Sequence, residues 1–116
     1  MFGLAKLNYK IKRYETAEYW LVKAYTQYRD IAYRIWLGFT YFKLYELLPI
    51  SNPKKAKFAS FAVKNLQRCA EDQNCSLYAN FGLLYLAASV MQEYSKSKVR
   101  IEGLSTMVNY AEDLSI

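Results

Sequence analysis

The sequence predicts an all-α protein of about six antiparallel helices, stacked as helix–turn–helix hairpins. Its 116 residues include two prolines and four glycines, too few turn residues for an all-β domain of this length. Apolar residues make up 53% of the chain and recur every three or four positions, which is the spacing of a helix with a buried face. The length fits a single domain, residues 1–116, that can bury a core without disulfides or metal.

Spacing and helix-terminating residues divide the chain into six expected helices. Asp30 is the expected N-cap of the third helix, and Pro49 ends that helix. Asn52 is the expected N-cap of the fourth, with Pro53 at the first helical position, where a backbone N–H is not needed. The expected helices span approximately residues 3–12, 15–28, 31–48, 54–71, 76–94 and 97–114.

The expected helices alternate between two apolar patterns. The third and fifth are apolar on nearly all sides, whereas the second, fourth and sixth each carry one apolar stripe. A stack of hairpins explains this, because one helix of each hairpin is enclosed and the other lies outside. A closed bundle would give all its helices similar stripes. We therefore expect hairpins at residues 1–30, 31–72 and 73–116.

A pattern of small and large residues recurs three times. The copies open with Leu4-Ala5, with Leu37-Gly38 and Tyr41, and with Phe81-Gly82 and Tyr85. They close with Ala17, Leu21 and Ala24; with Ala62, Leu66 and Cys69; and with Gly103, Met107 and Tyr110. In this pattern the chain resembles the tetratricopeptide-repeat (TPR) family of helical hairpins.

The resemblance covers nearly the whole chain and implies a right-handed superhelical solenoid, or a fragment of a longer one. Ala5 and Gly38 are 33 residues apart, close to the repeat length of about 34, but Gly38 and Gly82 are 44 apart. Asn8 also stands where the family has an aromatic residue.

The resemblance further implies a concave groove, lined by the first helix of each hairpin, that receives a peptide or a partner helix. Counted from the small residue of each copy, its lining residues would be Phe2, Lys6, Tyr9, Lys10, Ile35, Phe39, Phe42, Lys43, Ala79, Leu83 and Leu86. Further repeats or a second copy of the chain could cover the same residues instead.

The net charge of +6 is distributed unevenly. Residues 1–68 carry 13 basic and four acidic residues, and residues 69–116 carry three basic and six acidic residues. A basic half favours an acidic partner, either a protein or a nucleic acid, although basic residues are also ordinary on solvated helices. The expected basic surface comprises Lys12, Arg13, Lys54, Lys55 and Lys57.

Catalytic, metal and cofactor motifs are missing from the sequence. The chain has no histidine, its glycines are isolated rather than clustered in a phosphate-binding loop, and its two cysteines, Cys69 and Cys75, do not form a zinc motif. Cys69 lies on an apolar stripe and is expected to be buried. We therefore expect no enzymatic activity, no metal and no cofactor.

The most apolar stretch, Leu77–Met91, is shorter than a membrane span and contains Asn80. We therefore expect no transmembrane segment and, since nothing at the N-terminus resembles a signal peptide, an intracellular location in the cytoplasm or nucleus. The sequence thus favours a non-catalytic scaffold or adaptor that binds an amphipathic helix or peptide with apolar anchors and acidic flanks. The alternatives are a basic helical module that binds nucleic acid and a subunit that associates with itself.

Overall fold

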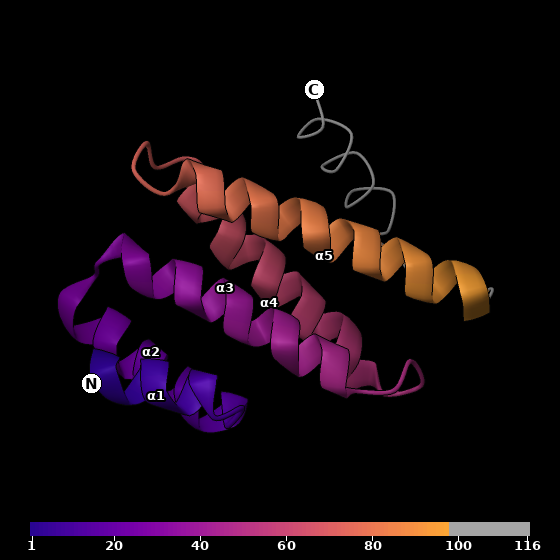
Figure 1. Ribbon diagram of the computed structural model, residues 1–116, viewed down its shortest axis with the longest axis horizontal. Coiled ribbons are helices and arrows are strands. Elements are labelled where there is room, and N and C mark those ends of the chain that lie inside the picture. The colour runs from indigo at the N-terminus through magenta and orange to yellow at the C-terminus, as the bar shows by residue number, and fades with distance from the viewer. Residues whose placement is uncertain (98–116) are drawn as a thin grey trace.

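The computed structural model describes residues 1–97, and within that range the chain is all-helical, with no strand (Figure 1). The helices are α1 (Phe2–Lys10), α2 (Tyr14–Tyr28), α3 (Ile31–Leu47), α4 (Pro53–Ala70) and α5 (Ser76–Ser97). The all-α prediction is therefore confirmed. The first five expected helices begin and end within three residues of the observed ones. The expected sixth helix lies, from residue 98 onward, outside the described residues.

The predicted caps of α3 and α4 form as expected. A side-chain oxygen of Asp30 accepts a hydrogen bond of 2.9 Å from the backbone N–H of Ala32. The corresponding oxygen of Asn52 accepts one of 2.9 Å from Lys54 N–H, and Pro53 opens α4. Each cap bonds a backbone N–H that has no partner inside its helix, so both start points follow from local sequence.

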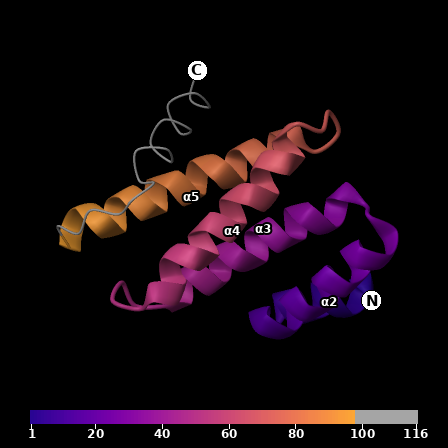
Figure 2. The same cartoon turned by 180° about the vertical axis from the view of Figure 1, so that it is seen from behind.

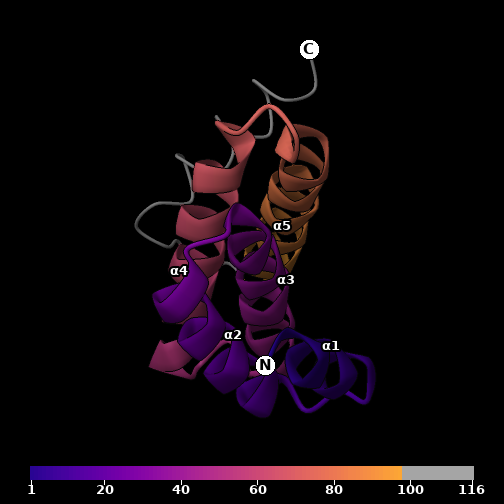
Figure 3. The same ribbon diagram turned by 90° about the vertical axis from the view of Figure 1, so that its left-hand side faces the viewer.

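Successive helices run back and forth and form two layers. Figures 1 and 2 show each helix reversing direction relative to the one before it, and each helix packs against the next. Figure 3 shows α2 and α4 on one side of the molecule and α1, α3 and α5 on the other. The contact between α1 and α3 is aromatic: the ring of Phe2 lies 4.8 Å from that of Tyr33, and the ring of Tyr9 lies 5.3 Å from that of Trp36.

Leu66 occupies the centre of the packing between α3, α4 and α5. Its side chain is fully buried, and a Cβ atom added to Gly38 of α3 would lie 2.6 Å from it. A Cβ added to Gly82 of α5 would lie 3.1 Å from Leu66 and 2.9 Å from the ring of Phe39. Both distances to Leu66 are shorter than ordinary van der Waals contact, so each glycine allows its helix to approach α4 closely.

Lys55 is buried, which corrects the prediction that it belongs to a basic surface. Its side chain is 1% exposed, and its ammonium group donates to the backbone oxygens of Tyr45 (2.8 Å) and Leu48 (2.7 Å) at the end of α3. It also pairs with Glu93 of α5 at 3.0 Å, and the Tyr45 hydroxyl donates to the same carboxylate at 2.9 Å. These contacts join the ends of three helices, because the last carbonyls of a helix have no partner within it.

Replacement of Gly38 by alanine should destabilise the fold. Overpacking against Leu66 costs about 1–3 kcal/mol, and the better helix propensity of alanine offsets about 1 kcal/mol of it. We expect the free energy of unfolding, measured by urea titration with circular dichroism, to fall by up to about 2 kcal/mol. Gly3→Ala is the control, because nothing lies within 4 Å of a Cβ at Gly3. Equal stability of the two variants would contradict the proposed packing.

Glu93→Gln should destabilise the protein because the buried ammonium of Lys55 loses its carboxylate. Glu93 is partly exposed, so we expect a loss of about 1–3 kcal/mol in the free energy of unfolding, less than for a fully buried pair. Glu71→Gln, which removes an exposed pair with Arg68, should change it by less than about 0.5 kcal/mol. A similar small effect for both variants would show that the Lys55–Glu93 pair contributes little.

Candidate binding groove

An apolar cavity of about 360 Å³ lies where α1, α3 and α5 meet. One residue of α1, three of α3, one of α4 and four of α5 surround it. They are Tyr9, Phe39, Phe42, Lys43, Leu66, Tyr78, Phe81, Gly82 and Tyr85.

Four residues that the sequence assigned to a groove line this cavity. Tyr9, Phe39 and Lys43 are half-buried, whereas Phe42 is almost fully buried in a cluster with Tyr45 and Leu86. These assignments placed the correct faces of α1 and α3 toward the opening. Their role in binding a partner stays a prediction.

The assignments on α5 require correction. Ala79, Leu83 and Leu86 are 0–2% exposed and therefore cannot be reached by a partner in this structure. Ala79 packs in a cluster with Cys69 and Cys75, and Leu86 in one with Phe42. This side of α5 is buried because Gly82 brings the helix close to Leu66.

The aromatic residues of α5 that line the cavity were missed as groove residues. Tyr78, Phe81 and Tyr85 are each 64% exposed and follow one another at helical spacing. Phe81 and Tyr85 belong to the third copy of the repeat pattern, so the signal was present in the sequence. Because α5 is apolar on nearly all sides, the spacing of its apolar residues does not indicate which face is buried. The sequence therefore left the rotation of this helix about its own axis undetermined.

Other expected groove residues lie outside the cavity lining. Ile35 packs against the cluster of Cys69, Cys75 and Ala79. Lys6 lies over the ring of Phe2, 4.3 Å from its centre, and Phe2 itself packs on Tyr33 and Trp36. Lys10 is exposed at the end of α1.

Lys43 is the charged residue among the described residues that line the apolar cavity. Its ammonium group lies 3.4 Å from the Glu46 carboxylate, one turn away on α3, and both side chains are about 40% exposed. Burial lowers the pKa of Lys43, but Glu46 and Tyr9 raise it by more, so the group stays charged at neutral pH. Burial also raises the pKa of Tyr9, which keeps its hydroxyl neutral. The cavity thus combines an apolar, aromatic wall with one positive charge.

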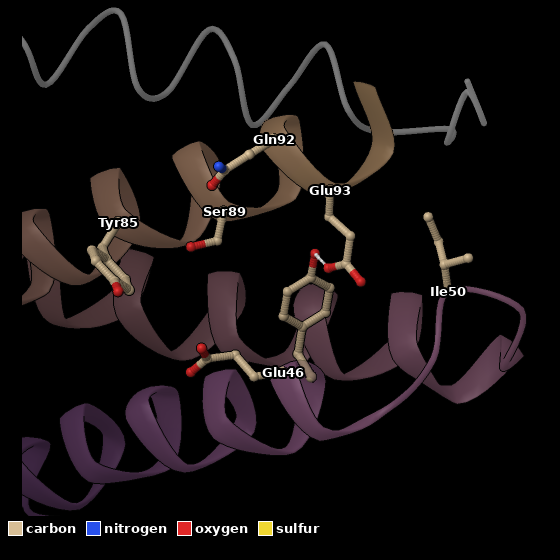
Figure 4. Close-up of a pocket in the computed structure, with 7 residues that line it drawn as sticks. Glu46, Ile50, Tyr85, Ser89, Gln92 and Glu93 are labelled. Atoms are coloured by element: carbon tan, nitrogen blue, oxygen red, sulfur yellow. Dashed lines mark hydrogen bonds between the residues drawn. The ribbon is translucent and has the colours of Figure 1, made fainter. Parts of the chain in front are cut away.

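A second, polar cavity of about 680 Å³ adjoins the first, and Tyr85 lines both. Figure 4 shows Tyr85, Ser89 and Glu93 along one side of α5, facing Glu46 of α3. Tyr45, Ile50 and Gln92 also line it, and among the described lining residues there are two carboxylates and no basic side chain. The two cavities differ in charge as well as in polarity.

The predicted basic surface is only partly available. Lys12, Arg13, Lys54 and Lys57 are exposed, in the turn between α1 and α2 and in the first turn of α4. Lys55, which was expected beside them, is held inside by its carbonyl and carboxylate partners. The nucleic-acid alternative therefore loses one of its five residues and stays a prediction.

Cys69 and Cys75 are both buried and both free thiols. The Cys75 thiol donates to the backbone oxygen of Cys69 at 3.4 Å, and the Cys69 thiol lies 3.7 Å from the oxygen of Ile31. Burial, assisted by Cys75, raises the pKa of Cys69 to about 12, and burial also raises that of Cys75. Neither group has the low pKa of a nucleophilic cysteine.

The thiols should therefore react slowly in the folded protein. Because their pKa values are raised, little thiolate is present at neutral pH, and more appears only as the pH rises. At about pH 8 we expect a disulfide reagent such as dithiobis(nitrobenzoate) to modify them about 100-fold more slowly than in urea. Rapid modification of one thiol per folded chain would contradict this environment.

Comparison with known proteins supplies no relative. No protein-family model, curated protein or solved structure matches the chain. Within residues 1–97 no helix is long and apolar enough to cross a membrane, and no group of three or more acidic or cysteine residues is placed to hold a metal.

Proposed function

We propose that this chain is a non-catalytic protein-interaction module that binds an amphipathic helix or peptide of a partner protein between α1, α3 and α5. The observation that carries the proposal is the apolar cavity of about 360 Å³ with Tyr78, Phe81 and Tyr85 exposed at its wall. Exposed aromatic residues gathered around a concave site are typical of protein-binding surfaces. A partner would insert an apolar side chain there and place an acidic residue near Lys43.

We also propose that the helices form a TPR-like stack of hairpins. Two features support this arrangement. The closing sets of the first two copies, Ala17, Leu21 and Ala24 with Ala62, Leu66 and Cys69, are completely buried. The helices also alternate between two layers, as in a repeat stack, so that the first helix of each hairpin lies on the side of the cavity. The cytoplasm or nucleus is the proposed location.

Phe81→Ser should weaken partner binding without unfolding the chain, because Phe81 is mostly exposed. A phage-displayed library of random peptides, about 16 residues long to span both cavities as a helix, supplies the ligand. We expect the affinity of a selected peptide, measured by fluorescence anisotropy, to fall about ten-fold or more. The control is Leu77→Ser on the same helix, since Leu77 is equally exposed but does not line the cavity.

Two results would count against the proposal. Failure to select any peptide, or equal binding to both variants, would remove the cavity as a binding site. If light scattering gave the mass of two chains for the unmodified protein and of one chain for Phe81→Ser, a second copy of the chain would be the natural occupant of the cavity.

A further inference from the structure

The two adjoining cavities differ in the charge of their lining, and this difference constrains the partner. Among the lining residues that the structure describes, Lys43 is the charged residue of the apolar cavity, and Glu46 and Glu93 are those of the polar cavity. Along α3 and along α5 the cavities follow each other in the same order. Their lining shifts from residues 39–43 to 45–46 on α3, and from 78–85 to 85–93 on α5. The groove therefore has a defined polarity along these helices.

Glu46 is the carboxylate best placed to meet a partner. Glu93 is already held by the buried Lys55 ammonium and by the Tyr45 hydroxyl. Glu46 is about 40% exposed, and within residues 1–97 it forms an ion pair with Lys43 at 3.4 Å. An exposed pair of this kind within one helix is weak, so a cation of a partner can replace Lys43 at little cost. Release of Lys43 would also leave its ammonium group available to an acidic residue beside the apolar anchor.

We infer that the groove selects an amphipathic helix carrying an apolar anchor for the aromatic cavity and a lysine or arginine for the polar cavity. This inference rests on the proposed function and adds the charge pattern of its ligand. Phe81 and Ser89 are eight residues apart on α5, which corresponds to about 12 Å along the helix axis. A partner helix lying along the groove covers that distance in just over two turns, or about eight residues. The aromatic ring of Tyr85, which lines both cavities, would lie against the aliphatic part of the basic side chain.

The inferred ligand differs from the one that the sequence suggested. The sequence favoured a partner with apolar anchors and acidic flanks. The carboxylates around the polar cavity make a basic flank favourable at the α5 C-terminal end, and Lys43 keeps an acidic residue favourable near the anchor. A groove with this charge order also binds its helix in one direction, since the reversed helix would place like charges together.

The experiment pans the phage-displayed random peptide library on the complete 116-residue chain, on Glu46→Lys and on Glu71→Lys. Glu71 is an exposed carboxylate at the end of α4 that lines neither cavity, which makes it a matched control for the charge change. With the unmodified chain we expect enrichment of lysine or arginine about eight residues from an apolar anchor. Peptides selected on Glu46→Lys should instead carry aspartate or glutamate at that position. Peptides selected on Glu71→Lys should still carry a basic residue there.

Affinity measurements separate the inference from the proposed function. A peptide selected on the unmodified chain should bind Glu46→Lys about ten-fold more weakly and Glu71→Lys with nearly unchanged affinity. Two results would overturn the charge pattern and leave the groove intact. In the first, the selected peptides lose binding to Phe81→Ser but show no preference for a basic residue. In the second, they lose binding to Phe81→Ser but bind Glu46→Lys as well as the unmodified chain. Peptides whose binding survives Phe81→Ser would overturn the groove itself, whatever their charge.

Discussion

The close approach of three helices around Leu66 is the constraint on which the rest of the structure depends. Gly38 and Gly82 face this side chain from α3 and α5, and neither position has room for a Cβ at ordinary contact distance. Because α3 and α5 both pack closely against α4 at this point, α3 and α5 also lie near each other. The cavity at their junction, with Phe39 beside Gly82, is a consequence of that approach.

The Lys55–Glu93 pair determines the arrangement at the other end of the same helices. A lysine with all three N–H groups directed at Tyr45, Leu48 and Glu93 closes the end of α3 and ties α5 to it. A buried charge is tolerated only where such partners are in place, so the pair favours one relative position of the helices. The polar cavity lies beside this pair, and the Glu93 carboxylate in its lining is therefore held in place.

Sequence reasoning identified the helices and half of the cavity wall. Asp30, Asn52 and Pro53 act within one helical turn, so their capping roles can be read from local sequence. Tyr9 and Phe39 were also placed correctly, because α1 and α3 carry the small residues from which their faces were counted. Lys55 was misplaced, since its burial depends on Glu93, which is 38 residues away along the chain.

The sequence by itself determined that this chain is helical, where its first five helices begin, and that Leu66 and Cys69 belong to the core. Those properties follow from helix periodicity, capping and small residues, which act over a few positions. Only the tertiary structure decided that Tyr78, Phe81 and Tyr85 line the apolar cavity, whereas Ala79, Leu83 and Leu86 are buried. A helix that is apolar on nearly every side can be buried in several rotations, and the contact of Gly82 with Leu66 selects one of them.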